Sequence, residues 1–315
     1  MKDLRIVFMG TPEFAATTLR QLIEAKYNVV GVITAPDRPA GRGRKLQQSD
    51  VKKYAVAQGL TVLQPTNLKN EAFLDELKSL NPNLQIVVAF RMLPRVVWEM
   101  PEYGTFNLHA SLLPDYRGAA PINWALINGE TVTGVTTFFI DDKIDTGEII
   151  LQKKIGIEKN ENAGALHDKL MTLGADLVLK TVELIETGSV TTEIQKRRDQ
   201  LKQAHKIHRE TCKIDWGKSI HEIYNHIRGL SPYPAAWTTL STNSEEILVK
   251  VYESRIEKAD HDFDNGRVIR TKKELKIAVR GGYIQLLEIQ LPGKRKMQIH
   301  DVLNGLNIDE NARML

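Results

Sequence analysis

The chain has 315 residues, about twice the length of a typical domain, which favours two domains or one large and one small domain. Hydrophobic residues make up 42% of the chain and charged residues 26%, and these values exclude a disordered protein or a fibrous repeat. The 43 Lys and Arg outnumber the 39 Asp and Glu, and the resulting net charge of +4 is compatible with nucleic-acid binding without indicating it.

The only cysteine, Cys212, excludes an intramolecular disulfide and a cysteine-rich zinc site. The N-terminal residues have neither the long apolar core nor the cleavage site of a signal peptide. No uncharged apolar run approaches the roughly 20 residues that cross a bilayer. We therefore expect a cytoplasmic protein.

The first half of the chain alternates short apolar runs with amphipathic stretches. The runs at 4–9, 28–34 and 84–90 predict buried strands, and the stretches at 14–25 and 70–80 predict helices. This alternation predicts an α/β fold with a doubly wound, mostly parallel sheet.

Sheets of this kind bind ligands outside the carboxyl ends of their strands. We therefore expect the chemistry to lie just after Met9, Thr34, Phe90 and the strand that ends near His109. The turn after the first strand, Gly10–Phe14, has one glycine instead of the three of a dinucleotide-binding turn. A structural turn is favoured there, and a hydride-transfer enzyme loses its main support.

The second half begins with a long amphipathic stretch, Ala163–Gly188, which predicts the last helix of the first domain. The following stretch, Ser189–Thr211, has many basic and few large apolar residues, as is typical of an exposed linker. We predict a catalytic domain at 1–189, a basic linker at 190–208 and a C-terminal domain at 209–315.

The C-terminal part contains one predicted helix, Ser219–Leu230, followed by short β-rich runs separated by turn signals. Short strands at this spacing predict a small β-barrel. Tyr233 and Trp237 lie beside prolines and are expected in the core of this barrel rather than as platforms for bases.

Asn107 and His109 are the first candidates for chemistry. They lie two residues apart on a predicted strand, so their side chains share one face at a strand end. An amide N–H can stabilise a developing oxyanion, and an imidazole can exchange a proton near neutral pH. A hydrogen-bonded polar pair with no catalytic role is the alternative, and the spacing alone favours it.

The segment 140–148 has three aspartates beside Gly147 but lacks the residue order of a calcium loop. It favours a single buried aspartate in a tight turn, where the side chain orients an active-site group. The histidines show no metal-ligand spacing, and we predict no metal site.

Several motifs occur together in a fixed order, and with them the chain resembles the methionyl-tRNA formyltransferases over nearly its whole length. The motifs are Thr34–Lys45, Asn107–Pro114, Arg117–Ile122, Asp145–Gly147, Leu230–Trp237 and His300–Gly305. The resemblance implies a Rossmann-like formyltransferase fold followed by a smaller OB-like domain that binds tRNA.

The resemblance also implies an activity. A formyl group would pass from the co-substrate 10-formyltetrahydrofolate to the α-amino group of methionine on initiator tRNA, with no metal, membrane or obligate protein partner. The family's catalytic residues fall on Asn107, His109 and Asp145. The alternative is a related folate-dependent formyltransferase or hydrolase that acts on a UDP-amino sugar or on formyltetrahydrofolate itself. A non-enzymatic RNA-binding protein is disfavoured because the three residues are intact.

The resemblance implies that the folate lies along the turn Ser111–Pro114 and that its pterin end borders the stretch Phe90–Pro94. The residues implied for folate binding are Phe90, Arg91, Leu93, Ser111, Leu112, Leu113, Pro114 and Asp142. The chain departs from the bacterial pattern after Phe90, where a glycine and one more residue usually precede the Leu-Pro pair. Arg91 is expected to place a cation at the folate pocket.

The loop from Arg38 to Lys45 resembles the insertion that contacts the acceptor end of the tRNA. Its cations, separated by glycines, suit phosphates and unpaired bases; they are Arg38, Arg42, Arg44 and Lys45. Without the resemblance, a solvated basic loop is the favoured interpretation. Further basic clusters lie in the predicted linker and at Lys294–Lys296.

Overall fold

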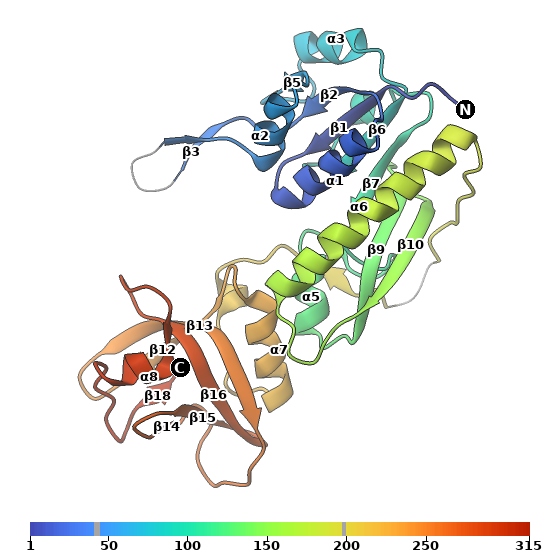
Figure 1. The fold of residues 1–315 in the computed structure, drawn as a ribbon. Coiled ribbons are helices and arrows are strands. Elements are labelled where there is room, and N and C mark those ends of the chain that lie inside the picture. Colours follow the sequence, from blue (N-terminus) through green and yellow to red (C-terminus); the bar gives the residue numbers. More distant parts are fainter. Residues whose placement is uncertain (41–44, 197–199) are drawn as a thin grey trace. The chain divides into compact units, whose positions relative to one another are not determined.

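The computed structural model describes residues 1–40, 45–196 and 200–315 (Figure 1). Contacts divide the chain into two compact units. Unit 1 contains Met1–Gly118, Thr133–Ile155 and His167–Gln203, and unit 2 contains Ala119–Val132, Gly156–Leu166 and Ala204–Leu315. These units group residues by their packing, and each combines segments from different parts of the sequence. The domain boundaries near residues 190 and 208 therefore remain a prediction.

Unit 1 is built on a seven-stranded sheet in the order β10-β9-β7-β6-β1-β2-β5. The neighbours from β7 to β5 are parallel, and β9 runs antiparallel to β7. The predicted mostly parallel sheet is confirmed. Its strands are β1 (Ile6–Gly10), β2 (Val29–Ile33), β5 (Val62–Leu63), β6 (Leu84–Val88), β7 (Thr105–His109), β9 (Val132–Phe139) and β10 (Ile149–Gly156).

Helices cover both faces of this sheet. On one face, Phe73 and Leu77 pack with Val87 of β6 in a common apolar cluster. On the other face, Gly174 lies so close to Leu108 that a Cβ there would come within 2.8 Å of the leucine side chain. The helices are α1 (Glu13–Glu24), α2 (Asp50–Ala57), α3 (Glu71–Ser79), α4 (Arg95–Trp98) and α6 (Ala163–Thr187).

The helices α1 and α6 lie side by side on the same face of the sheet (Figure 1). The Gln21 amide of α1 donates to Asp176 of α6 at 3.1 Å, and the Thr17 hydroxyl contacts the Met171 sulfur at 3.3 Å. None of the helices in the described ranges is both long and apolar enough to span a membrane.

Unit 2 is an antiparallel sheet in the order β14-β15-β16-β13-β12-β18, with β17 paired to β16. The N–H of Met314 donates to Gly266 O at 2.8 Å, and that of Val268 donates to Ala312 O at 3.1 Å, so the two ends of the strand path meet. The sheet is thus nearly closed, and the predicted barrel is confirmed. Its strands are β12 (Ala236–Ser241), β13 (Glu246–Glu257), β14 (Val268–Arg270), β15 (Leu275–Val279), β16 (Gly282–Gln290), β17 (Met297–Gln298) and β18 (Arg313–Met314).

Helix α7 (Ile220–Leu230) covers the core of this unit. It begins after Ser219, where a reciprocal capping box with Glu222 satisfies the backbone N–H groups of these two residues. Ile223 and Ile227 are buried in the barrel core. The other short elements of unit 2 and its edges are α5 (Pro121–Ile127), β11 (Gln203–Ala204), a 3₁₀ turn (Glu210–Cys212) and α8 (Ile299–Leu303).

Tyr233 was expected in the barrel core, and this expectation is wrong because its side chain is 83% exposed. The residue lies in the turn between α7 and β12, outside the strands whose alternate side chains point into the barrel core. Trp237, on β12, packs against the core, and its indole Nε1 donates to Arg209 O at 2.9 Å.

One histidine of α7, His226, is half-buried in unit 2. The Nε2 atom of His226 is buried and has no hydrogen-bond partner in the described ranges. Burial lowers the pKa of His226, and the charge of Lys218 acts in the same direction, whereas Asp215 and the carbonyls of Cys212 and Lys213 oppose it. The folded protein therefore favours the neutral imidazole.

This burial predicts acid sensitivity. A folded-state pKa below the unfolded value of about 6.5 means that the unfolded chain takes up the proton first, so the free energy of unfolding decreases as the pH falls below about 6.5. Urea unfolding at about pH 7.5 and about pH 5.5 should show a smaller decrease for His226→Gln than for the wild type. The exposed His221→Gln is the control and should keep the wild-type decrease. Equal pH dependence in all three proteins would refute the assignment.

Candidate active site

The parallel strands place their carboxyl ends at one edge of the sheet, as expected for a site. β7 lies between β6 and β9, with Asn107 opposite Val87 on one side and Phe138 on the other. Asn107 and His109 project from the face opposite to that of Leu108. Within the described ranges the Asn107 amide makes no hydrogen bond, and it is available to a ligand at this edge.

His109 is 6% exposed, and its ring is fixed by a backbone contact. Its Nε2 lies 2.8 Å from the carbonyl oxygen of Tyr116. A carbonyl can only accept a hydrogen bond, so Nε2 carries a proton in this arrangement. Nδ1 is therefore the ring atom that can gain or lose a proton during a reaction.

Asp145 lies beside this Nδ1 atom. Its Oδ2 is 3.9 Å from His109 Nδ1 and accepts a hydrogen bond of 2.8 Å from the N–H of Gly118. The distance to Nδ1 is too long for a hydrogen bond and short enough for strong attraction to an imidazolium. The structure thus brings together two of the three residues predicted for catalysis, from β7 and from the β9–β10 turn.

The turn that carries Asp145 has an unusual backbone. Asp145 has φ = 55°, in the left-handed region that few non-glycine residues adopt. Two residues on, Gly147 packs so tightly that a Cβ would lie 1.7 Å from Phe139 O. The Asp-Thr-Gly motif therefore has a physical basis, since only glycine allows the turn to close against β9.

Sequence reasoning missed Gln195, which contacts this turn. Its amide Nε2 donates to Asp145 O at 2.9 Å and to Gly147 O at 2.8 Å. The stretch around it was expected to be an exposed linker, and this is wrong at Gln195, which is 7% exposed. A lone glutamine in a charged stretch carries no local signal for such a contact.

The turn Ser111–Pro114, predicted to bind folate, is attached to the neighbouring strands. The Thr136 hydroxyl donates to Ser111 O at 2.7 Å, and the Leu113 N–H donates to that hydroxyl at 3.2 Å. The Gln152 amide donates to Leu113 O at 2.8 Å. Of the four residues, Leu112 is half-buried and the others are buried. The turn is therefore a rigid, largely apolar wall, and its contact with folate remains a prediction.

Arg91 lies at the predicted pterin end. Its guanidinium donates to the carbonyls of Pro65 and Thr66 and lies over the Phe90 ring, with Arg91 Cζ 5.5 Å from the ring centroid. Burial, aided by the charge of Arg38, lowers the pKa of Arg91. Two of its donors are thus used to connect the loops after β5 and β6.

Leu93, implied for the pterin end, and Asp142, implied for folate binding, differ in exposure. Leu93 is buried, whereas Asp142 is exposed. Asp142 belongs to the β9–β10 turn, where the neighbouring Asp141 carboxylate accepts a hydrogen bond of 2.7 Å from the Thr146 hydroxyl. The roles of Leu93 and Asp142 in folate binding remain predictions.

The predicted tRNA loop is described only at its base. Arg38 is on β3 (Arg38–Ala40), which pairs with β4 (Lys45–Gln47) and leads away from the sheet (Figure 1). Arg42 and Arg44 lie outside the described residues, as does the side chain of Lys45.

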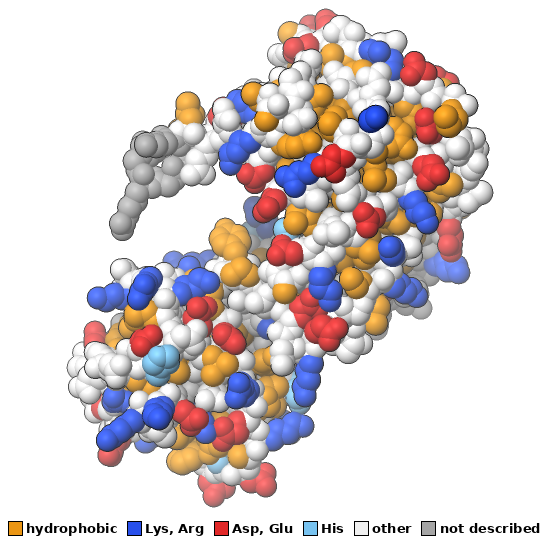
Figure 2. All heavy atoms as spheres, viewed as in Figure 1, with side chains coloured by type: hydrophobic (Ala, Val, Ile, Leu, Met, Phe, Trp, Pro, Cys, Tyr) orange, Lys and Arg blue, Asp and Glu red, His pale blue; other side chains and the backbone are white. Residues whose placement is uncertain are grey.

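The base of this loop is attached by an ion pair. Lys52 Nζ lies 2.6 Å from Asp37 Oδ2, and the Gln64 amide donates to Asp37 Oδ1 at 2.8 Å. These hydrogen bonds, that of Lys52 above all, hold the pKa of Asp37 below its usual value. On the face shown in Figure 2, basic and acidic side chains are interspersed over both units.

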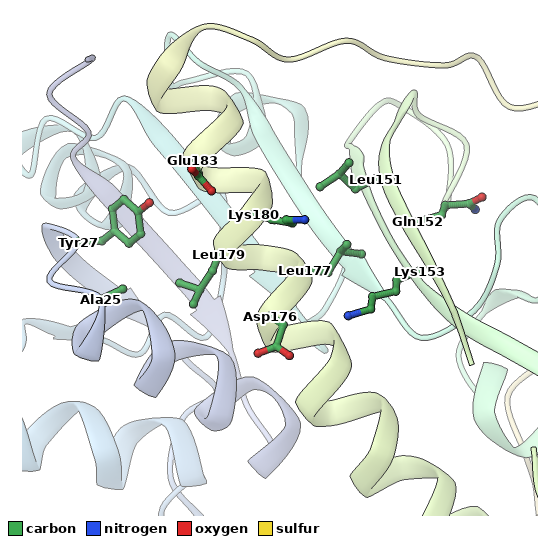
Figure 3. A pocket seen from close by; sticks show the side chains of 10 residues that line it. All are labelled: Ala25, Tyr27, Leu151, Gln152, Lys153, Asp176, Leu177, Leu179, Lys180 and Glu183. Carbon is green, nitrogen blue, oxygen red and sulfur yellow. The ribbon is translucent and has the colours of Figure 1, made fainter. Parts of the chain in front are cut away.

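The described residues provide no metal centre beside this site. Within the described ranges, no three His, Cys, Asp or Glu side chains are placed to hold a metal ion. A hollow of about 490 Å³ lies on the surface around α6, where Tyr27, Lys153 and Lys180 contribute to its lining (Figure 3). Its lining includes none of the residues predicted for catalysis.

Comparison with known proteins identifies the family. Residues 4–182 match the model of formyl transferase, and residues 206–307 match that of the formyl transferase C-terminal domain. Relatives named methionyl-tRNA formyltransferase include those of Flavobacterium johnsoniae, 61% identical over 100% of both chains, and Bacteroides thetaiotaomicron, 52% identical over 99% of both chains.

Solved structures show the same fold. A sugar 3N-formyl transferase superposes with a TM-score of 0.65 at 20% identity, covering 94% of this chain and 100% of the other. Glycinamide ribonucleotide transformylase 1 from Symbiobacterium toebii superposes with a TM-score of 0.52 at 18% identity, covering 61% of this chain and 94% of the other. With both family models and the full-length relatives in agreement, the chain belongs to the formyl transferase family, among the methionyl-tRNA formyltransferases.

Proposed function

We propose that this chain transfers the formyl group of 10-formyltetrahydrofolate to the α-amino group of methionine on initiator tRNA. The full-length similarity to relatives of that name carries the choice of acceptor. The placement of His109 beside Asp145, on the strand that bears Asn107, supports the chemistry. A protein with this role in translation initiation acts in the cytoplasm.

The residues of the site suit attack of a neutral amine on a formyl carbon. Such an attack places negative charge on the formyl oxygen. The Asn107 amide can donate to that oxygen because, within the described ranges, this amide makes no other hydrogen bond. The attacking nitrogen must lose a proton. His109 Nδ1 is the ring atom able to accept it, directly or through a water, and the Asp145 carboxylate stabilises the resulting imidazolium.

The tRNA is proposed to contact the basic loop between β3 and β4. Arg38 stands at its base, and the Asp37–Lys52 ion pair holds the backbone there. Folate is proposed to lie along Ser111–Pro114, whose backbone is fixed by Thr136 and Gln152. Both substrates would then meet at the edge that bears Asn107 and His109.

The acceptor is tested with a panel of substrates. Purified protein with 10-formyltetrahydrofolate should formylate initiator methionyl-tRNA faster than elongator methionyl-tRNA, and should leave a UDP-amino sugar unreacted. Hydrolysis without an acceptor is the background measurement. Reaction of the sugar nucleotide together with an unreacted initiator tRNA would refute the proposal.

The chemistry is tested by His109→Ala and Asp145→Asn. Loss of the proton acceptor, or of the charge that stabilises it, should reduce kcat by about 10²- to 10⁴-fold, with KM for both substrates changed far less. Steady-state kinetics with initiator methionyl-tRNA measures both constants. His167→Ala, on α6, is the control and should turn over normally. Near wild-type kcat in either site variant would contradict the assignment.

The loop is tested by Arg38→Ala and Arg42→Ala. If each cation binds a phosphate, KM for methionyl-tRNA should rise, and the slope of log KM against log salt should decrease by about 0.7 to 1 for each phosphate that is no longer neutralised. KM for folate should stay nearly unchanged in Arg42→Ala, which is the deciding variant because the charge of Arg38 also acts on Arg91 at the predicted pterin end. Lys78→Ala, a surface cation of α3, is the matched control. A parallel increase in both KM values would argue against the loop as the tRNA-binding segment.

A further inference from the structure

Three residues close together in the sequence attach the stretch after α6 to the turn that carries Asp145. The Thr192 hydroxyl donates to the Glu148 carboxylate. Glu193 exchanges two backbone hydrogen bonds with Ile149, of 2.8 and 2.9 Å. Gln195 then donates to two carbonyl oxygens of the turn itself. The chain thus returns to the site after a 25-residue helix.

The other end of the Gln195 amide binds Arg117. Its Oε1 accepts from Arg117 Nη2 at 2.6 Å and from Arg117 Nε at 3.2 Å. Arg117 lies in a short segment that serves both catalytic partners. The preceding carbonyl, of Tyr116, binds His109 Nε2, and the following N–H, of Gly118, binds Asp145 Oδ2.

We propose that Gln195 is a positioning residue for formyl transfer. One buried amide connects the segment that holds His109 with the turn that holds Asp145, and so fixes the separation between Nδ1 and the carboxylate. The inference rests on the proposed function, because it assigns Gln195 a role through Asp145. Gln195 itself contacts no reacting atom.

The chemistry of the site requires this side chain type. The carbonyl oxygens of Asp145 and Gly147 each accept from the amide N–H₂, and the Arg117 guanidinium donates to the amide oxygen. Only a side chain that carries a donor and an acceptor at its end can satisfy all three groups. A glutamate would keep the contact to Arg117 and turn an oxygen toward the carbonyls. A methionine would fill the space and make none of the hydrogen bonds.

The conformation of the turn explains why it needs an external support. Asp145 has φ = 55°, a left-handed conformation that few non-glycine residues adopt unless the surrounding structure holds them there. The hydrogen bond from Gln195 is made to the carbonyl of that same residue, Asp145. Without it, the turn can relax and move the carboxylate away from His109.

The test uses Gln195→Met and Gln195→Glu in the full-length protein. Both should lower kcat by about 10- to 100-fold while KM for each substrate changes by less than about threefold, because the supporting hydrogen bonds act on the reacting geometry and not on binding. The control is Gln285→Met, a half-buried glutamine of β16 whose amide donates to Glu274 at 3.2 Å, and it should keep wild-type kcat.

A double-mutant cycle separates positioning from a general structural defect. In an Asp145→Asn background, where the carboxylate is already removed, Gln195→Met should reduce kcat by less than about threefold. A full additional reduction would show that Gln195 acts on folding or elsewhere, and would overturn the inference. Wild-type kcat in Gln195→Met would do the same.

A second measurement does not depend on turnover. Amide hydrogen exchange in the peptide that contains residues 141–149 should be faster in Gln195→Met and unchanged in Gln285→Met. Unchanged exchange in Gln195→Met would contradict the inference. If the wild-type protein fails to formylate methionyl-tRNA, the proposed function fails, and the exchange result still decides whether Gln195 supports the turn.

Discussion

The hydrogen bond from His109 Nε2 to the Tyr116 carbonyl is the interaction on which the rest of the site depends. It fixes a proton on Nε2, because the carbonyl can only accept, and leaves Nδ1 as the atom proposed to exchange a proton. It also gives the segment after the Ser111–Pro114 turn a fixed position. In the same segment, the N–H of Gly118 donates to the Asp145 carboxylate. This contact holds the carboxylate beside His109 Nδ1, where it can stabilise an imidazolium.

The sheet provides the rigid base for these contacts. β7 is an interior strand between a parallel and an antiparallel neighbour, and Leu108 is fixed against α6 at Gly174. The period-two geometry of the strand then directs Asn107 and His109 to the opposite face. The proposed reaction needs donors and a proton acceptor that hold their positions while charge develops, and an interior strand supplies them.

Arg91 connects two loops beside the predicted pterin end. Arg91 was expected to place a cation at the folate pocket, which remains a prediction, and two of its donors bind the carbonyls of Pro65 and Thr66. These hydrogen bonds connect the loops after β5 and β6. Arg38 lies near enough for its charge to affect the pKa of Arg91, so the base of the basic loop and the predicted pterin end share one electrostatic environment.

The sequence by itself determined the parallel sheet and the barrel, because strand alternation and turn signals are local and survive in a linear pattern. The assignment of Asn107, His109 and Asp145 came from the family resemblance, since the spacing of Asn107 and His109 alone favoured a non-catalytic polar pair. Only the tertiary structure decided which nitrogen of His109 is protonated, since the partner carbonyl is seven residues away across a turn. It also decided the contacts of Gln195, which reaches Asp145 over 50 residues, and the exposure of Tyr233. Contacts between distant segments depend on packing, and no local pattern records them.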